Sequence, residues 1–326
     1  MTDKISRVRL KDIAERAGVS LTAASMFING KAKKFHLADT TCERIRKAVS
    51  ELGYVPNIHA RAIASKRTLL LGMIVSSDIE TSFWLNILSG IEEVIAKDDY
   101  HMILSVSRED PVRELTAIEF MLNKGIDGLL ISTLPDRKDN HDFLRELQKR
   151  MPVVTVNQRV EGISGVFNDN YLGGEMAAEC LLENGHRKIA YIGKRNIPRE
   201  LAFAAALSAA GIEYAAFATA RDFLKEYRNF DAVFCFSDYV ALELYNLAGV
   251  EGINIPEAFS VVGYDNMEFV QFTRPRLTTV AQWKRELGVS AGELIMEALK
   301  SGKKDFEARQ KIFRPKLIFA ESVRKI

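Results

Sequence analysis

The sequence predicts a small all-α head followed by a larger α/β body with two doubly wound, parallel sheets. Residues 1–55 contain no proline and no strand-like apolar run, and their apolar residues recur at helical spacing. After Thr68, short apolar runs alternate with amphipathic stretches, which is typical of βαβ units whose parallel sheet is covered on both faces. These elements are too many for one small sheet, so we expect two lobes within one body.

The first two helices of the head are expected within residues 10–30. Ile13 and Ala17 stand four residues apart and form one apolar helix face. Gly18 then supplies a tight turn, because it adopts positive φ without a Cβ clash, and Ser20 is a natural N-cap for the next helix. The inner face of that helix is expected to consist of Ala24, Phe27 and Ile28. This pattern predicts a helix-turn-helix, although other small three-helix bundles share it.

A third helix is expected to begin within residues 40–43, Thr-Thr-Cys-Glu, which fit a capping box, and Gly53 should end it. Residues 54–67 are either a linker or a short helix that begins near Pro56. Two helical turns are too short to be stable alone in water, so such a helix would form only on docking.

The body elements are expected where apolar runs and amphipathic stretches occur in turn. Strands are expected at residues 69–75, 102–106, 128–132, 153–156, 188–192, 231–236 and 260–263. Helices are expected at residues 84–97, 115–123, 172–183 and 238–247.

Composition excludes several classes of protein. The chain has 326 residues, of which 27% are charged and 47% hydrophobic, as in ordinary globular proteins. No apolar run approaches the ~20 residues of a membrane span, and the first residues lack a signal-peptide core, so we expect a cytoplasmic protein without a membrane partner. The cysteines Cys42, Cys180 and Cys235 are too far apart for a disulfide framework. We expect no metal and no cofactor.

Charge is distributed unevenly along the chain. Residues 1–68 hold 14 Lys and Arg against 6 Asp and Glu, a net charge of +8, whereas the remainder holds 31 against 37, a net charge of −6. A basic head on a mildly acidic body predicts a polyanionic partner for the head. Charge alone is equally consistent with a well-solvated basic surface.

Several motifs occur in an order that is similar to one known family. They are residues 10–20 (Leu-Lys-Asp-Ile-Ala-Glu-Arg-Ala-Gly-Val-Ser), 28–30 (Ile-Asn-Gly), 52–57 (Leu-Gly-Tyr-Val-Pro-Asn), 261–265 (Val-Val-Gly-Tyr-Asp) and 277–280 (Leu-Thr-Thr-Val). On these residues the chain resembles the lactose/galactose-repressor family of bacterial transcription regulators, essentially from end to end. The loop at residues 29–39 is longer than in the lactose repressor and is similar to that of the fructose and sucrose regulators.

The resemblance implies a helix-turn-helix domain, a hinge and a body of the periplasmic-binding-protein type I fold that forms a homodimer. The implied boundaries are 1–57 for the DNA-binding domain, 58–68 for the hinge helix and linker, and 69–326 for the effector-binding domain, with an N-lobe of about 69–160 plus 282–311 and a C-lobe of about 161–281 plus 312–326. The chain ends without a leucine heptad, so we expect no tetramerisation helix. The stretch from Arg199 to Ser237 is shorter than in the family.

The resemblance also implies which residues contact DNA. They are Ser20, Leu21, Thr22, Ser25, Met26, Asn29, Asn57, Ala60 and Ile63. Met26 stands where relatives often carry an arginine that reads guanine; a thioether cannot donate that hydrogen bond, but Met26 and Leu21 could contact a thymine methyl. Asn29 and Asn57 match phosphate-contacting positions, and Ile63 matches a hinge leucine that enters the minor groove.

A pocket for a small effector is implied between the lobes. Its expected residues are Phe83, Trp84, Asn157, Arg199, Ser237, Asp238, Asp265 and Gln282. An arginine, a carboxylate and a flat aromatic ring suit a sugar or sugar phosphate, since hydroxyls need donors and acceptors and C–H faces need an apolar platform. A purine or another metabolite is the alternative effector. Core packing of Phe83 and Trp84, and loop capping by Asp265, are the alternative interpretations of these residues.

The sequence therefore predicts a sequence-specific DNA-binding transcriptional regulator, a repressor whose affinity for operator DNA a small ligand controls. A sugar-active enzyme could use two carboxylates such as Asp238 and Asp265, but the motifs of serine hydrolases, zinc proteases and P-loop enzymes are missing from the sequence. A free sugar-binding transport protein would carry a signal peptide and no basic head.

Overall fold

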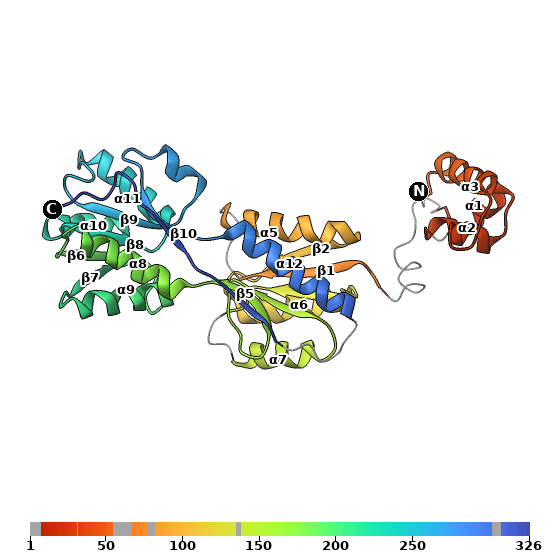
Figure 1. Cartoon of the computed structure of the whole chain (residues 1–326), viewed down its shortest axis with the longest axis horizontal. Helices are drawn as coiled ribbons and strands as arrows, with labels where there is room; N and C mark the ends of the chain where they lie inside the picture. The colour runs from red at the N-terminus through yellow and green to blue at the C-terminus, as the bar shows by residue number, and fades with distance from the viewer. Residues whose placement is uncertain (1–7, 31, 55–66, 77–81, 135–137, 302–307) are drawn as a thin grey trace, which may run out of the picture. The chain divides into compact units, whose positions relative to one another are not determined.

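The chain forms two compact units, Met1–Leu70 and Leu71–Ile326, each with its own hydrophobic core (Figure 1). The computed structural model describes residues 8–30, 32–54, 67–76, 82–134, 138–301 and 308–326. Asn57, Ala60 and Ile63, and most of the hinge expected at residues 58–68, lie outside the described residues.

The head unit contains α1 (Leu10–Ala17), α2 (Leu21–Ile28) and α3 (Asp39–Leu52). The tight turn between the first two helices is confirmed, because Gly18 has φ 62° and the Ser20 side chain accepts a hydrogen bond from the Ala23 backbone N–H at 3.1 Å. The buried core of the head consists of Ile13, Ala14, Ala17, Ala24, Ile45 and Ala48.

The capping box expected at residues 40–43 does not form. Helix α3 already begins at Asp39, two residues before the first helical residue that this capping box implies. Its N-cap is Ala38, which has no side-chain oxygen to bond the first turn. Thr40 and Thr41 therefore lie inside the helix, where they cannot serve as its cap.

The first lobe of the body is built on a sheet with the strand order β11-β5-β4-β3-β1-β2. Its strands are β1 (Leu70–Val75), β2 (His101–Val106), β3 (Gly128–Ile131), β4 (Val153–Val156), β5 (Ser164–Asn168) and β11 (Gln310–Phe313). Its helices are α5 (Ser82–Ile95), η1 (Ala96–Asp98), α6 (Pro111–Asn123), α7 (Lys138–Gln148) and α12 (Lys284–Ser301).

The second lobe is built on a sheet with the strand order β12-β10-β9-β8-β6-β7, in which β12 runs antiparallel to β10. Its strands are β6 (Ile189–Ile192), β7 (Tyr214–Phe217), β8 (Ala232–Cys235), β9 (Ser260–Asp265), β10 (Thr278–Ala281) and β12 (Lys316–Ile318). Its helices are α8 (Asn170–Glu183), α9 (Pro198–Ala209), α10 (Ala220–Glu226), η2 (Tyr227–Asn229), α11 (Asp238–Val250) and η3 (Glu268–Phe272).

Two of the lobe boundaries expected from the sequence are wrong. Strand β5 pairs in parallel with β4, so the first lobe continues to Asn168 instead of ending at residue 160. Strand β11 pairs with β5, so Ile312 and Phe313 also belong to the first lobe. The chain therefore crosses between the lobes after β5, after β10 and after β11.

The three crossovers are fastened to one another by hydrogen bonds. The Asp169 backbone N–H donates to the Phe313 carbonyl oxygen at 2.9 Å, and the Trp283 backbone N–H donates to the Asn168 side-chain oxygen at 3.3 Å. The Trp283 indole Nε1 also donates to the Arg314 carbonyl oxygen at 2.6 Å. These bonds make one compact connection between the lobes, of the kind about which domains can hinge.

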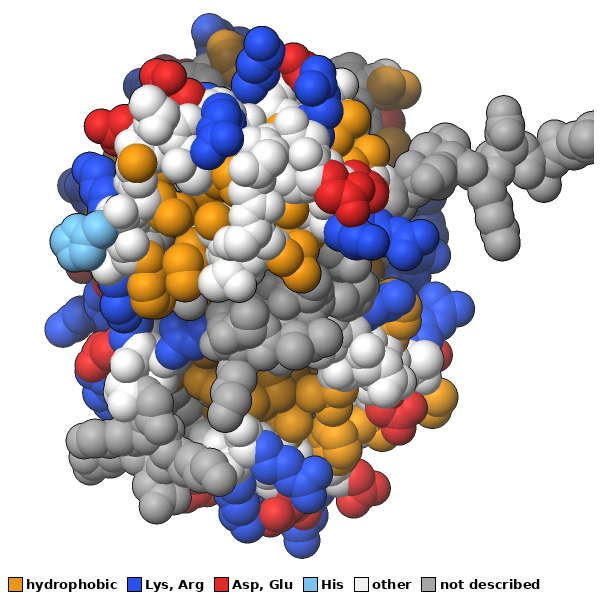
Figure 2. Space-filling view, turned by 90° about the vertical axis from the view of Figure 1, so that its right-hand side faces the viewer, with side chains coloured by type: hydrophobic (Ala, Val, Ile, Leu, Met, Phe, Trp, Pro, Cys, Tyr) orange, Lys and Arg blue, Asp and Glu red, His pale blue; other side chains and the backbone are white. Residues whose placement is uncertain are grey.

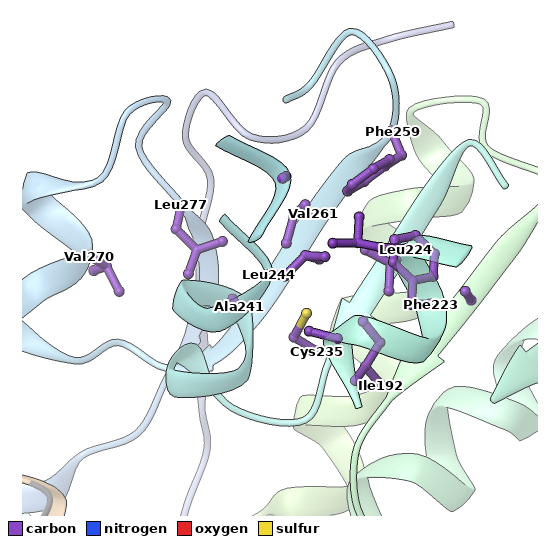
Figure 3. Packing of buried hydrophobic residues seen from close by; sticks show 14 of the residues in the cluster. Ile192, Phe223, Leu224, Cys235, Ala241, Leu244, Phe259, Val261, Val270 and Leu277 are labelled. Carbon is purple, nitrogen blue, oxygen red and sulfur yellow. The ribbon is translucent and has the colours of Figure 1, made fainter. Parts of the chain in front are cut away.

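Close packing holds each lobe together. In the first lobe, α5 and α12 lie side by side (Figure 1), and a Cβ at Gly90 or Gly288 would collide with the backbone of the facing helix. In the second lobe, aromatic and aliphatic side chains between β8, β9, α10 and α11 form a dense core (Figure 3). Phe223 and Phe259 meet there edge to face, with ring centroids 5.0 Å apart.

The surface carries hydrophobic patches between lysine and arginine side chains, as the face in Figure 2 shows. Among the described helices, none combines the length and apolar character that a membrane crossing requires.

Candidate functional sites

The exposed face of α2 forms one wall of a shallow cavity of about 430 Å³ in the head. The cavity is lined by Leu10, Leu21, Thr22, Ser25, Met26, Asn29 and Phe35. Five of these are positions that the sequence analysis assigned to DNA contact. Ser20 lies at the start of α2, where its Oγ caps the helix, so it has a structural role there as well.

Asn29 is held at the end of α2. Its Nδ2 donates to the Ser25 carbonyl oxygen at 2.9 Å and approaches the Ser25 Oγ at 3.3 Å. The amide hydrogens expected to contact a DNA phosphate are thus engaged within the helix in this structure.

The body contains a cavity of about 920 Å³ between its two lobes. Its walls include Phe83, Trp84, Asn157, Arg199, Ser237, Asp265 and Gln282, all of which were expected from the sequence. The other lining residues are Ser76, Arg108, Glu109, Ser132, Thr133, Leu134, Gln158, Lys194, Ile197, Phe236, Tyr239 and Met267. Asp238 is the one expected pocket residue that does not line it.

Arg199 is fixed in the cavity wall by contacts within the protein. Its Nη1 donates to the Phe236 carbonyl oxygen and its Nη2 to the Asn170 side-chain oxygen, both at 2.8 Å. Its guanidinium carbon lies 3.8 Å from the centre of the Tyr264 ring, a cation–π contact. A Cβ at Gly174 would collide with the Arg199 backbone, so this glycine lets α8 and α9 approach where the arginine is placed.

Asp265 lies beside Arg199, with Oδ1 at 3.7 Å from Nη1, and accepts a hydrogen bond from Gln282 Nε2 at 2.5 Å. Burial raises the pKa of Asp265 above its ordinary value, while the Arg199 charge, the Gln282 hydrogen bond and the Lys284 charge oppose that rise. Together the three side chains present an ordered set of donors and acceptors to the cavity.

Two amide oxygens in the cavity region have no hydrogen-bond partner among the described residues. They are Asn157 Oδ1 and Gln282 Oε1, and both are buried. A buried acceptor without a partner costs free energy, so these atoms favour a ligand that donates hydrogen bonds. Asn157 lies between β4 and β5, which belong to the same sheet.

Backbone strain also gathers around the cavity. Arg108, Glu109, Asn157 and Asp265 have φ values of 52°, 57°, 59° and 104°, in the region that favours glycine. Non-glycine residues in this region cluster at ligand sites, where the surrounding structure holds them in place.

The aromatic pair contributes mainly one ring to the cavity. The Phe83 and Trp84 rings meet edge to face at 5.7 Å, but Trp84 is only 3% exposed. Phe83 is half-buried and packs against the core of the second lobe. Trp84 therefore mainly packs in the core, as the alternative interpretation held, and Phe83 is better placed to contact a ligand.

Asp238 is a structural carboxyl and not a pocket residue. It is fully buried and accepts hydrogen bonds from the Met267 backbone N–H at 2.7 Å and from Thr279 Oγ1 at 2.6 Å. Burial, followed by the neighbouring Asp265 charge, raises the pKa of Asp238 to about 8. The expectation failed because the Asp238 side chain is buried and its hydrogen bonds fasten the loop after β9 to β10.

Comparisons with known proteins identify the family. Residues 9–57 match the family model of bacterial regulatory proteins, lacI family, and residues 178–323 match the periplasmic binding protein-like domain. An HTH-type transcriptional repressor PurR from Mannheimia succiniciproducens is 30% identical over 337 residues, covering 97% of this chain and 99% of the relative. The chain belongs to the lacI family of bacterial regulatory proteins.

Solved structures of lacI-family regulators share the fold. A lac repressor dimer bound to operator and the anti-inducer ONPF is 22% identical, with a TM-score of 0.84 and coverage of 97% of this chain and 99% of that one. A complex of the transcriptional regulator CelR with cellobiose is 25% identical, with a TM-score of 0.68 and coverage of 97% and 100%. The similarity of the head loop to fructose and sucrose regulators stays a prediction.

Membership of this family establishes the broad function. The relatives are DNA-binding transcriptional repressors, so this lacI-family chain is a transcription regulator and not an enzyme. The structure also argues against the enzyme alternative, because Asp238 is fully buried and does not line the cavity, so it is not placed to act with Asp265 on a substrate.

Sequence reasoning missed two links between the lobes of this lacI-family body. Lys194 Nζ pairs with Glu109 Oε1 at 2.8 Å across the cavity. On α5, Ser82 donates a short hydrogen bond to Glu268 of η3, and Asn86 Nδ2 donates to the same carboxylate at 2.7 Å. Burial would raise the pKa of Glu268, but these hydrogen bonds outweigh it and lower the pKa below its usual value.

A positional signal for some of the missed residues exists in the sequence. Ser76, Ser132 and Lys194 each follow closely after a strand of a parallel sheet. Ligands of open α/β sheets bind at the carboxyl ends of the strands, so residues in these places are candidates whatever their motif. The Ser76 and Ser132 hydroxyls lie 3.2 Å apart there.

Proposed function

We propose that this protein represses transcription by binding operator DNA through α2, and that a small ligand in the interlobe cavity controls its affinity for DNA. The observation that carries the proposal is the fixed Arg199–Asp265–Gln282 set in a cavity whose walls come from both lobes. A ligand that contacts both lobes favours the arrangement in which they are closed around it, and so shifts the conformational population.

The effector that the cavity fits best is a sugar or sugar phosphate. Hydroxyl groups can donate to Asp265, to Asn157 Oδ1 and to Gln282 Oε1, and can accept from Arg199. The walls also contain three cationic side chains, Arg108, Lys194 and Arg199, against two carboxylates, so one additional phosphate charge can be accommodated. The structurally similar CelR binds cellobiose, which supports this class.

A purine is the second candidate effector. Phe83, Phe236 and Tyr239 provide aromatic rings in the cavity wall, and a planar base could stack on such a ring. Relatives about 30% identical over nearly the whole chain are named PurR, which favours this candidate. A purine offers fewer hydrogen-bond donors than a sugar to Asp265, Asn157 Oδ1 and Gln282 Oε1, and for this reason it is the second candidate.

The protein is proposed to act as a homodimer through the first lobe. Leu85 on α5, Leu104 on β2, and Val112 and Phe120 on α6 are exposed large hydrophobic side chains. Strand β2 is also the last strand of its sheet, so its outer edge is open to a partner. Exposed apolar groups of this kind mark protein interfaces.

Residues 58–68 are proposed as the hinge that couples the body to the DNA. In this proposal Asn57 contacts a phosphate, while Ala60 and Ile63 approach the minor groove when a short helix forms on the operator.

The experiment that tests the proposal has two steps with the full-length protein. A thermal-shift screen of sugars, sugar phosphates and purines identifies the ligand that stabilises the protein. Operator binding is then measured with and without that ligand. We expect a sugar or sugar phosphate to stabilise the body and to change DNA affinity. Stabilisation by purines alone would replace the sugar with the second candidate, and a ligand without effect on DNA affinity would contradict the regulatory proposal.

A further inference from the structure

The cavity on α2 is unusual in its chemistry. Leu21 is 53% exposed and Phe35 is 47% exposed, and both line this cavity. They are the two large hydrophobic side chains that are exposed in the described part of the head. Leu10 and Met26 add further apolar surface from α1 and α2. A small, basic head that leaves its exposed apolar side chains together on one face has a binding surface there.

Phe35 comes from the loop between α2 and α3, beyond the helix-turn-helix itself. Phe35 lines the same cavity as Leu21 and Met26. The extended loop thus completes a wall that the two helices alone leave open.

The hydrogen-bonding capacity of this cavity is small. Among the described residues, its lining contains no lysine or arginine that could make a bidentate contact to guanine. The Nδ2 of Asn29 is already bonded to Ser25, which hinders the paired contact that an asparagine makes with adenine. The hydroxyls of Thr22 and Ser25 remain, and hydroxyls discriminate poorly between bases.

The operator must offer an apolar group to such a wall. In the major groove the edges of the four base pairs present hydrogen-bond donors and acceptors, and the one apolar group among them is the C5-methyl of thymine. The positive charge needed to attract the phosphates lies elsewhere in the head, whose residues 1–68 carry a net charge of +8.

We propose that the cavity formed by α2 and closed by Phe35 binds thymine methyl groups, and that Phe35 is a residue that determines operator specificity. The inference rests on the proposed use of α2 to bind operator DNA. It adds a residue from outside the helix-turn-helix and the chemical group that this residue recognises.

The test begins with selection of operators from a randomised duplex library by the full-length protein. Each dT of the selected half-site is then replaced by deoxyuridine, which removes the methyl and keeps base pairing. We expect one or two positions at which this change weakens binding roughly fourfold, the value for one buried methyl-sized group.

The variants assign these positions to the cavity. In Phe35→Ala the ratio of affinities for the dT and deoxyuridine duplexes should fall towards one at one of the sensitive positions, and Leu21→Ala should act in the same way at the same or the adjacent position. Lys34→Ala is the matched control in the same loop: it should weaken both duplexes equally. Since Phe35 and Leu21 are half-exposed, helical circular dichroism should show that both variants remain folded.

The outcomes separate the inference from the function on which it rests. Failure to select any duplex would overturn the proposed DNA-reading function and the inference with it. A selected operator in which every deoxyuridine substitution is neutral would overturn the inference alone. The inference is equally wrong if methyl sensitivity exists but is unchanged in both Phe35→Ala and Leu21→Ala, because the methyls are then read elsewhere.

Discussion

Lys194 and Glu109 form an ion pair at 2.8 Å that joins the two lobes across the effector cavity. Lys194 follows β6 of the second lobe, and Glu109 follows β2 of the first. Both side chains are more than half exposed, at 56% and 53%, so the pair contributes at most ~1 kcal/mol to stability. Its position gives it more influence on lobe closure than on folding.

Removal of this pair should weaken effector binding more than it weakens the fold. Lys194→Met is expected to change the free energy of unfolding by less than ~1 kcal/mol and to lower effector affinity up to about fivefold, because closure then lacks one interlobe contact. Calorimetric titration and urea unfolding measure the two quantities. Lys149→Met, which breaks an exposed ion pair with Glu146 at the end of α7, is the control and should leave effector affinity unchanged. Equal effects of both variants on binding would contradict the prediction.

Asp238 should make the body less stable as the pH rises. Its pKa is raised from 3.8 to about 8, so the folded state keeps a proton that the unfolded state releases above about pH 4. The contribution of Asp238 to the free energy of unfolding is therefore greatest below about pH 4 and declines as the pH rises towards 8. The difference in unfolding free energy between wild type and Asp238→Asn should fall steadily across this window. Urea unfolding at several pH values measures it.

Thr279→Val provides the control for that measurement. It removes one hydrogen bond to Asp238 and keeps the titrating carboxyl, so it should lower stability while the dependence on pH remains. A constant difference between wild type and Asp238→Asn over the whole window would show that the carboxyl is ionised in the folded protein.

Operator affinity should fall steeply with salt, because each contact of a lysine or arginine with a phosphate releases counterions. For the full-length protein we expect a loss on the order of 10³-fold between low and physiological salt. Lys33→Gln should reduce the slope of log affinity against log salt by about one, while Lys149→Gln in the body should not change it. An affinity that is flat over this range would exclude phosphate contacts as the main source of binding.

Met26→Arg should change which operator is preferred. A guanidinium at this position of α2 can make two hydrogen bonds to a guanine, which is worth ~1–3 kcal/mol against other bases. Selection from a randomised duplex library with each protein tests this. If both return the same consensus, the side chain at position 26 does not contact a base.

Features of this fold that depend on neighbouring residues could be predicted from the sequence. Features that depend on contacts between residues far apart in the sequence could not. Gly18 and Ser20 define their turn by their own backbone and side-chain chemistry, so the helix-turn-helix was recognisable. Strand β5 was missed because Ser164–Asn168 is short and mixed in polarity, and it is buried only through its neighbours β4 and β11. Because β5 was missed, the expected end of the first lobe at residue 160 was too early.

The same distinction holds within the candidate site. Asp238 follows Ser237 at the start of α11, and its burial away from the cavity depends on hydrogen bonds to Met267 and Thr279, which are distant in the sequence. Lys194 and Glu109 are 85 residues apart and both are exposed, so nothing in their local sequence indicates the pair. Asp265 lies in one of the motifs that carry the family resemblance, and Arg199 and Gln282 were expected from the resemblance alone. The contacts of these three residues with one another became visible only in the folded chain.

Loss of the fixed donor and acceptor set should abolish the response to effector and leave the binding of DNA intact. Arg199→Ala or Asp265→Ala removes one member of the set, whereas the residues proposed to bind DNA lie in the head, a separate compact unit. Coupling between two such sites is typically ~1–3 kcal/mol, so operator affinity of wild type should change about five- to 150-fold on addition of effector, and that of either variant should not change. The measurement is operator affinity with and without the identified effector.

Arg276→Ala, at an exposed ion pair with Glu321 outside the cavity wall, is the control that should respond like wild type. A variant that still responds at the wild-type effector concentration would show that its residue does not bind the ligand. Loss of operator binding without effector, in a variant that remains folded, would show instead that the pocket and the DNA-binding surface are not independent.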